Sequence, residues 1–365
     1  MYIYENPEWP NFTWDNKKLM NLLGIVRNLQ GRLLGQMEAI GFSLKEEAIL
    51  GTLTTDVIKS SLIEGEILDL EQVRSSIARK LGMDIAGLIP SNREVEGIVE
   101  MMLDATQKYN QNLTKERLFN WHAALFPTGH SGMYKILVGD WRKDLKGPMQ
   151  VVSGPIGKEQ VHYEAPKAEN LEDEMTRFLD WFDRENQIEP VIKSGIAHLW
   201  FVTIHPFEDG NGRIARAIGD MQLARAEKTS QRFYSLSDQI EHDKKSYYNI
   251  LESTQKGPLD VTNWLLWYLE SLSKALNRSK ELLSKVLVKA NFWTKHASTI
   301  LNKRQHKMIN ILLDDFFGKL TTSKWAKINK CSQDTALRDI QDLLDKGILI
   351  KESGGGRSTS YALIL

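Results

Sequence analysis

With 365 residues, the chain is long enough for two or three domains, each with its own hydrophobic core. Its 47 basic and 47 acidic side chains give a formal net charge of zero, so no global electrostatic argument favours a nucleic-acid or membrane partner. The single cysteine, Cys331, excludes an internal disulfide framework, and no apolar run of about 18 residues is present to span a bilayer. Because the first residues also lack the basic start and apolar core of a signal peptide, we expect a cytoplasmic protein without a membrane partner.

Helical patterns dominate the first part of the chain. Apolar side chains recur at helical spacing in three segments: residues 19–40, 92–102 and 118–126. Two strand-like runs follow, at 149–152 and 160–163, and the segment between them contains glycine and proline. This alternation predicts a small β-hairpin in an otherwise helical protein.

A mostly apolar run from Val191 to Ile204 predicts a buried helix, which Pro190 is well suited to start. The helix should end at His205, because Pro206 disfavours the α region for the residue before it and cannot continue the hydrogen-bond ladder. We therefore expect His205 to lie at the end of the helix and to face out of the core.

A Gly-Asn-Gly turn at residues 210–212 follows, and Arg213 opens a second helical run. A helix N-terminus behind such a turn is well suited to bind an anion. No Gly-Lys-Ser/Thr follows the glycines, and a helix rather than a strand precedes them, which excludes a P-loop and argues against a dinucleotide fold. A zinc site is also disfavoured, because no His-x-x-x-His or cysteine pair accompanies His198, which we expect to be a core histidine.

From about residue 300 the pattern changes. Three helical segments, 308–313, 322–328 and 332–344, precede two short strand-like runs around a glycine-rich tip. This order resembles a winged helix. A winged helix predicts DNA contacts from four residues of the third helix and one on the wing: Ser332, Gln333, Thr335, Arg338 and Arg357.

The charge of this C-terminal segment does not decide between partners. Residues 301–365 carry 11 basic and 7 acidic side chains, a balance of +4. However, Asp334, Asp339 and Asp342 lie on the reading helix, where phosphates would repel them. Protein docking or homodimer formation therefore fits the segment at least as well as DNA binding.

Residues 205–216 read His-Pro-Phe-Glu-Asp-Gly-Asn-Gly-Arg-Ile-Ala-Arg. This stretch resembles the signature of Fic proteins, H-P-F-x-(D/E)-G-N-G-R-x-x-R, and matches all nine of its specified positions. The resemblance implies transfer of a nucleoside monophosphate, usually AMP from ATP, to a Ser, Thr or Tyr hydroxyl of a target protein. It makes His205 the general base and Asp209 the ligand of a Mg²⁺ ion that bridges the phosphates. A histidine of near-neutral pKa suits proton abstraction from a hydroxyl at pH 7.

The same resemblance assigns the phosphate contacts. Gly210, Asn211 and Gly212 would cradle the α- and β-phosphates, Arg213 would contact the β-phosphate and Arg216 the γ-phosphate. Backbone donors and guanidinium groups are the partners that a leaving pyrophosphate requires. Taken singly, these residues read as a helix cap and a solvated helix face, but nine matched positions favour the site.

Residues 60–65 resemble the inhibitory motif of the family, (S/T)-x-x-x-E-(G/N), through Ser60, Glu64 and Gly65. If Glu64 forms a partly buried, bidentate ion pair with Arg216, the guanidinium is not free for the γ-phosphate, and ATP binds in a pose that His205 cannot use. We therefore expect Glu64 to hold the enzyme inactive, and Glu64→Gly to increase AMP transfer, including transfer to the chain itself. A solvated glutamate beside a glycine that ends a helix is the alternative.

The predicted hairpin, residues 148–164, occupies the place of the Fic flap. In the family this flap docks the target by strand addition, which implies roles for Val151, Val152, Val161 and His162. A purely structural hairpin is the alternative.

Two further residues resemble the adenine and ribose contacts of Fic proteins. Tyr248 follows another tyrosine, and Gln255 lies seven positions later, where many relatives have asparagine. A place in the hydrophobic core is equally consistent with the paired tyrosines.

Together these patterns predict an all-α Fic fold with a small flap and a C-terminal winged helix. The expected domains are an N-terminal helical domain (1–90), a catalytic core (91–290) and the winged helix (300–365). Two other functions remain open: hydrolysis of AMP-protein at the same site, with Glu64 positioning a water, and DNA-binding regulation with a nucleotide-sensing core.

Overall fold

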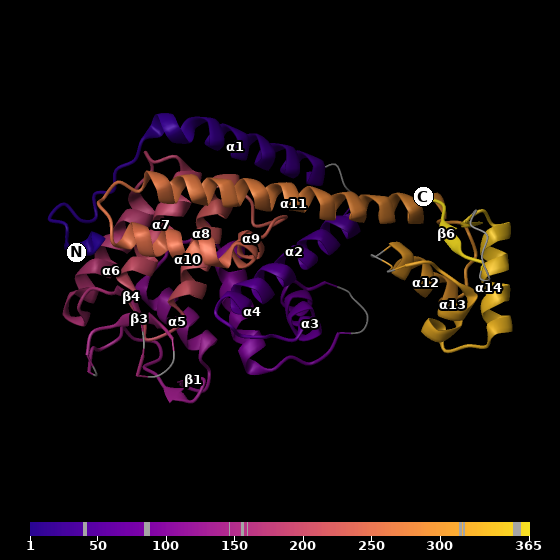
Figure 1. The fold of residues 1–365 in the computed structure, drawn as a ribbon, viewed down its shortest axis with the longest axis horizontal. Helices are drawn as coiled ribbons and strands as arrows, with labels where there is room; N and C mark the ends of the chain where they lie inside the picture. Colours follow the sequence, from indigo (N-terminus) through magenta and orange to yellow (C-terminus); the bar gives the residue numbers. More distant parts are fainter. Residues whose placement is uncertain are drawn as a thin grey trace. The chain divides into compact units, whose positions relative to one another are not determined.

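The computed structural model describes residues 1–38, 42–83, 88–145, 147–154, 157–158, 160–313, 316, 318–352 and 359–365. The chain forms two compact units, Met1–Ser279 and Lys280–Leu365. The mainly helical fold expected from the sequence is confirmed (Figure 1). Among the described residues, no helix has both the length and the apolar character required to cross a membrane.

The first unit is built almost entirely of helices. In chain order they are η1 (Ile3–Glu5), α1 (Asn16–Glu38), α2 (Phe42–Ile63), α3 (Leu70–Lys80), α4 (Arg93–Gln107), α5 (Lys115–Leu125), η2 (Ala168–Asn170), α6 (Leu171–Arg184), α7 (Pro190–Ile204), α8 (Asn211–Glu227), α9 (Leu236–His242), α10 (Lys244–Gln255) and most of α11 (Thr262–Lys295). This unit contains both the predicted N-terminal domain and residues 91–279 of the predicted core.

Helices α7 and α8 form the centre of the first unit (Figure 1). Every residue of α7 after Pro190 is buried, as the apolar run predicted. Helix α8 packs against α7, α4, α2 and α5, and α11 contacts α7 where the Trp264 indole donates to the Gly195 carbonyl oxygen (2.8 Å). The surrounding helices therefore fix the loop between α7 and α8 from several sides.

One glycine permits a close helix contact near this centre. A Cβ atom added at Gly97 on α4 would lie 1.7 Å from the Ala124 carbonyl oxygen of α5. Only glycine allows the two backbones to approach this closely.

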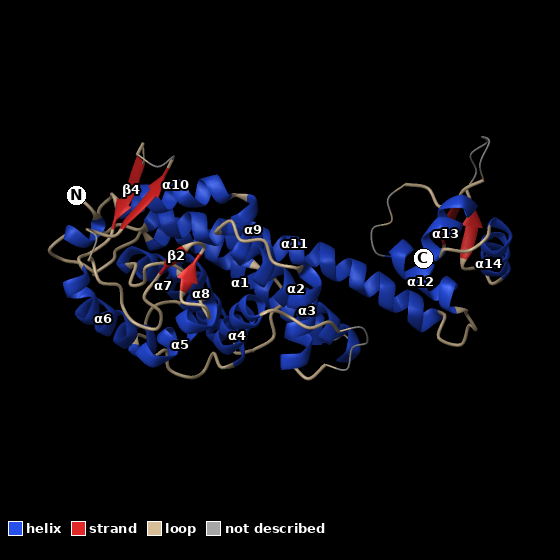
Figure 2. Ribbon diagram, turned by 90° about the horizontal axis from the view of Figure 1, so that it is seen from below, coloured by secondary structure: helices blue, strands red, loops and turns tan. Residues whose placement is uncertain are grey.

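Three short antiparallel pairs supply the β-structure of the described residues: β1 (His130–Ser131) with β2 (Tyr134–Lys135), β3 (Gln150–Ser153) with β4 (Gln160–Glu164), and β5 (Leu349–Lys351) with β6 (Tyr361–Leu363). The β3–β4 hairpin lies beside α10 (Figure 2) and has a register shift between Val151 and Val152. It corresponds to the hairpin predicted at 148–164, of which residues 155, 156 and 159 lie outside the described residues.

The second unit contains the end of α11, α12 (Lys303–Leu313), α13 (Thr322–Asn329), α14 (Gln333–Asp345) and the β5–β6 pair. Its core gathers Trp325, Ile340 and Leu343 around Phe292 of α11. The order of helices and strands is the one the sequence predicted, while Arg357 and the glycine-rich tip lie outside the described residues.

Asp339 does not face solvent, although its place on the predicted reading helix suggested that it would. It is buried on α14, and Arg304 Nε donates to its Oδ2 at 2.7 Å. Because this ion pair neutralises the carboxylate, Asp339 contributes little to the repulsion of phosphates that we expected from that helix.

Candidate active site

His205 ends α7 in a left-handed backbone conformation (φ 52°, ψ 57°). Pro206 follows it, which explains why the helix cannot continue. The ring Nδ1 donates to the Val202 carbonyl oxygen at 3.2 Å, because a carbonyl can only accept. In the neutral ring, Nε2 therefore carries the lone pair and is the nitrogen available to take a proton.

The electrostatic surroundings of His205 differ from the sequence expectation. Burial, helped by the nearby Arg142 guanidinium, lowers the pKa of His205 to about 4, and not to the near-neutral value we expected. The cause is the cost of placing a charged ring in the half-buried site at the end of α7. At pH 7 the ring is neutral and free to accept a proton.

Arg142 holds the backbone of the loop and was not identified from the sequence. Its Nε donates to the His205 carbonyl oxygen at 2.8 Å, and its backbone N–H donates to the Pro206 carbonyl oxygen at 2.9 Å. The guanidinium also contacts Asp144 and the Pro166 carbonyl. These contacts fix the strained conformation of His205, and no local pattern around residue 142 predicted them.

Asn211 closes the loop between α7 and α8. Its Oδ1 accepts from the Phe207 N–H (3.0 Å), and its Nδ2 donates to the Phe207 carbonyl oxygen (2.8 Å). Phe207 is fully buried and stacks on His122, with ring centroids 4.2 Å apart. The side chain of Asn211 thus shapes the turn, which leaves backbone N–H groups as the donors that the turn offers to a ligand.

Asp209 lies in the loop two residues before the start of α8. Its Oδ1 accepts from the Gly210 N–H at 2.5 Å, and the Ser131 hydroxyl donates to its Oδ2. Arg213 Nη2 lies 3.8 Å from Oδ1. Ser131 comes from the β1–β2 pair, and its contact with Asp209 could not be found from sequence spacing.

Arg216 is paired with the end of α2. Its Nη2 lies 2.7 Å from Glu64 Oε1 and 2.8 Å from the Ser60 carbonyl oxygen, while its Nε donates to Ser60 Oγ at 2.9 Å. The Arg216 side chain is 2% exposed and that of Glu64 is 28% exposed. The structure brings Glu64 and Arg216 together as predicted, but through one oxygen and one nitrogen and not as a bidentate pair, and Ser60 supplies two further acceptors.

Arg213 has a partner that the sequence did not suggest. Its Nη1 lies 2.6 Å from Glu66 Oε2, and its guanidinium carbon lies 5.0 Å from the Phe126 ring centroid. The Arg213 side chain is only 3% exposed.

The N-terminus of α8 has the properties of an anion site. A Cβ atom added at Gly212 would lie 2.2 Å from Glu64 Oε1, so the carboxylate occupies the space that the missing side chain leaves. Arg213 Nε and Arg216 Nη1 are buried and find no hydrogen-bond acceptor in the part of the chain that the structure describes. The Glu64 carboxylate lies above Gly212 and accepts from Arg216 Nη2, while the two unpaired nitrogens suit the oxygens of an anionic ligand.

A model of the Fic/DOC family matches residues 112–223, which include this loop. The chain carries a Fic/DOC domain. Residues 2–83 match a separate family described as a domain of unknown function (DUF4172).

Several named relatives share this Fic domain. A protein named Protein adenylyltransferase Fic from Culex quinquefasciatus is 30% identical over 203 residues, which cover 54% of this chain and 36% of the relative. Its counterpart from Drosophila mojavensis is 27% identical over 217 residues, which cover 55% of this chain and 39% of that protein. The chain thus spans less than half the length of these curated relatives.

Solved structures share the fold. A Fic family protein from Desulfovibrio desulfuricans superposes with a TM-score of 0.56 at 21% identity, covering 97% of this chain and 98% of that one. A Fic domain containing signaling protein from Bacteroides thetaiotaomicron gives a TM-score of 0.52 at 22% identity, covering 74% and 96% of the two chains.

The β3–β4 hairpin, the predicted flap, lies within the segment that the Fic/DOC model matches. Val152 and Val161 pair across β3 and β4 and are both exposed, and Val151 is half-buried. His162 links the flap to α10, because its Nδ1 lies 2.7 Å from Glu252 Oε2 and its Nε2 lies 2.6 Å from Ser153 Oγ. Strand addition at this edge stays a prediction.

The two predicted nucleoside contacts lie in different surroundings. Tyr248 is partly exposed and its hydroxyl donates to the Ile63 carbonyl oxygen at 3.4 Å, next to the end of α2. Gln255 is 5% exposed and its amide donates to Thr203 Oγ1 at 3.3 Å, so it does not face open solvent in this state. Their roles at an adenosine also stay predictions.

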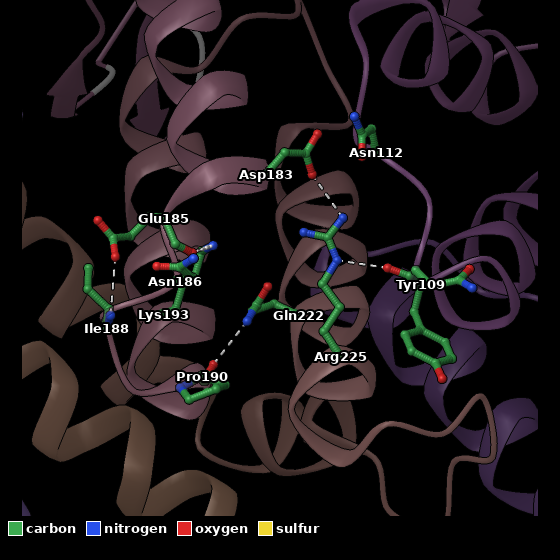
Figure 3. Close-up of a pocket in the computed structure, with 11 residues that line it drawn as sticks. Tyr109, Asn112, Asp183, Glu185, Asn186, Ile188, Pro190, Lys193, Gln222 and Arg225 are labelled. Atoms are coloured by element: carbon green, nitrogen blue, oxygen red, sulfur yellow. Dashed lines mark hydrogen bonds and ion pairs between the residues drawn. The ribbon is translucent and has the colours of Figure 1, made fainter.

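A separate cavity of about 400 Å³ lies near the start of α7 (Figure 3). Pro190 lines it, about 20 Å from His205 at a rise of 1.5 Å per helical residue. Its charged groups serve the fold: Arg225 pairs with Asp183 (2.9 Å), and Lys193 donates to the Phe182 carbonyl oxygen (2.7 Å) at the end of α6. This cavity is distinct from the loop that carries the Fic signature.

Proposed function

We propose that this chain is a Mg²⁺-dependent protein adenylyltransferase that moves AMP from ATP to a Ser, Thr or Tyr hydroxyl of a target protein. The observation that carries the proposal is a neutral histidine at the end of α7, facing the same loop as an anion site at the start of α8. The names of the relatives support the same reaction.

In the proposed reaction, His205 Nε2 takes the proton of the target hydroxyl. The hydroxyl oxygen then forms a bond to the α-phosphorus of ATP, while the bond from that phosphorus to the bridging oxygen breaks and pyrophosphate leaves. The turn at residues 210–212 would hold the α- and β-phosphates through the backbone N–H groups of Asn211 and Gly212, since the Gly210 N–H is bonded to Asp209. Arg213 and Arg216 would stabilise the charge on the leaving pyrophosphate, since both are buried and retain unpaired N–H donors.

The residues present suit a magnesium ion between ATP and the protein. Mg²⁺ binds proteins through one or two carboxylates together with substrate phosphates, and Asp209 is such a carboxylate beside the anion site. The hydrogen bonds from Gly210 and Ser131 orient Asp209 for this role. Bound there, the ion would neutralise phosphate charge.

We propose further that Glu64, with Ser60 and Gly65, keeps the enzyme inactive. The ion pair between Glu64 and Arg216 occupies the guanidinium that the γ-phosphate would use, and the Glu64 carboxylate fills the space above Gly212. ATP and Glu64 therefore compete for one cation.

The target would dock on the β3–β4 flap, where Val152 and Val161 are exposed. We propose that residues 300–365 form a winged helix that docks a protein partner. Leu337 at the middle of α14 is half exposed, which suits an apolar contact better than a phosphate backbone. A salt-dependent shift of duplex DNA by the purified chain would favour DNA binding instead.

Intact mass spectrometry tests the reaction. The full chain with Glu64→Gly is incubated with Mg²⁺ and each nucleoside triphosphate in turn. We expect a gain of one or more AMP units with ATP, and no gain after a second change, His205→Ala. The exposed His242→Ala serves as the matched control and should retain transfer. Transfer that survives His205→Ala would refute the base assignment, and removal of AMP from a modified target without any transfer would favour the hydrolase.

A further inference from the structure

The segment after α2 presents two carboxylates to the anion site. Glu64 pairs with Arg216 (2.7 Å), and Glu66, two residues later, pairs with Arg213 (2.6 Å). Both arginines are nearly fully buried and come from the first turns of α8. One short turn of chain therefore engages both cations of the Fic signature.

The backbone of this turn explains how both carboxylates reach α8. Gly65 adopts φ +85°, its N–H donates to the Leu62 carbonyl oxygen, and the Glu66 N–H donates to the Ser61 carbonyl oxygen, each at 3.0 Å. This pair of bonds is a Schellman motif with glycine at its left-handed position. The turn holds Glu64 and Glu66 in fixed positions on either side of Gly65.

We infer that Glu66 is a second inhibitory carboxylate, which competes with substrate phosphate for Arg213. Together, Glu64 and Glu66 weaken the binding of a nucleotide according to the number of its phosphates. The inference rests on the proposed function, in which Arg213 receives the β-phosphate and Arg216 the γ-phosphate. Through Arg216, the charge of Glu64 then opposes a nucleotide with three phosphates. Through Arg213, the charge of Glu66 opposes any nucleotide with at least two, and AMP needs neither arginine.

The surroundings of Glu66 suit a carboxylate that a ligand displaces. Its side chain is 43% exposed. Partial burial, together with the neighbouring charges of Asp209 and Glu64, raises the pKa of Glu66 in spite of the attraction of Arg213. A cavity of about 300 Å³, lined by Glu66, Arg213, Phe126 and Ser131, gives the side chain room to move.

Equilibrium binding of ATP, ADP and AMP to the full chain, measured by calorimetry with Mg²⁺, tests the inference. The variants are Glu66→Gln, Glu64→Gln and the double variant, and the exposed Glu71→Gln on α3 is the control for loss of one charge. Glu66→Gln should tighten binding of both ATP and ADP by about tenfold, because a charge-assisted pair with Arg213 is lost. Glu64→Gln should tighten the binding of ATP alone, and the affinity for AMP should be the same in every variant. Glu71→Gln should bind each nucleotide as the unaltered chain does.

Unchanged ADP affinity in Glu66→Gln would overturn the inference. If Glu64→Gln still tightens the binding of ATP in that case, the proposed function stands and only the role of Glu66 fails. If Glu64→Gly neither binds ATP nor transfers AMP, the proposed function itself fails. Tighter AMP binding in Glu66→Gln would also contradict the inference, because it would indicate a general charge effect and not competition at Arg213.

Discussion

Replacing Glu64 with glycine should convert the chain from an inactive to an active transferase. The change removes the carboxylate that lies 2.7 Å from Arg216 Nη2 and empties the space above Gly212. The fold should survive, because Glu64 follows the last residue of α2 and is partly exposed.

The magnitude follows from the geometry of the pair. A hydrogen bond between charged groups contributes about 1.5–3 kcal/mol, and each 1.4 kcal/mol is about tenfold in affinity. Since Glu64 and the γ-phosphate compete for Arg216, the apparent affinity for ATP should rise about 10- to 100-fold in Glu64→Gly. Glu64→Gln keeps an oxygen acceptor without the charge and should give an intermediate value.

Glu64→Gly should also be less stable than the unaltered chain when no nucleotide is bound. Arg216 is 2% exposed, and a buried charge left without its partner is strongly destabilising. Without nucleotide, Glu64→Gly should therefore melt at a lower temperature than the unaltered chain. Saturating ATP with Mg²⁺ should raise the melting temperature of Glu64→Gly by more than it raises that of the unaltered chain.

Two measurements decide the outcome. Transfer of tagged AMP is followed against ATP concentration, and melting temperatures are recorded with and without nucleotide. A gain in transfer below about twofold at low ATP would refute competition for Arg216, because even the weakest charged hydrogen bond predicts about tenfold.

Three further outcomes follow from the backbone and the buried histidines. Gly65→Ala should raise transfer about fivefold, because an alanine at φ +85° destabilises the inhibitory turn by about 1 kcal/mol; Gly82→Ala, at φ +68°, is the matched control and should not activate. Because burial lowers the pKa of His205 to about 4, kcat/KM should stay flat between about pH 6 and 8. An inflection near pH 6.5 would contradict the lowered pKa of His205. Burial also lowers the pKa of His198 to about 3, so the folded chain binds fewer protons than the unfolded chain below about pH 6.5, and stability is lost as the pH falls. His198→Phe should reduce the slope of the free energy of unfolding with pH by about 1.4 kcal/mol per unit in that window.

The sequence located the site because its chemistry is local. Pro206 ends a helix, the glycines at 210 and 212 permit the turn, and Arg213 and Arg216 follow within one helical turn and a half. These features depend on backbone rules that act over a few residues, so spacing alone predicted α7, the loop and the start of α8. The pairing of Glu64 with Arg216 was predicted only because a recognisable motif marked each partner.

Residues whose partners lie far along the chain were missed. Glu66 is 147 positions from Arg213, and Arg142 is 63 positions from His205. Neither belongs to a pattern that distinguishes it from other charged residues. In the second unit, Asp339 looked exposed by its place on a helix, and only its contact with Arg304 revealed the buried pair.

The sequence by itself determined several helices, α7 and α8 among them, where α7 ends and which residue types surround the loop, because dihedral preferences and apolar periodicity act locally. The tertiary structure decided which carboxylate meets which arginine and how strongly burial shifts a pKa. Both depend on the distance and solvent exposure of groups that folding brings together. His205 illustrates the division: its place at a helix end follows from Pro206, whereas its low pKa follows from the packing around it.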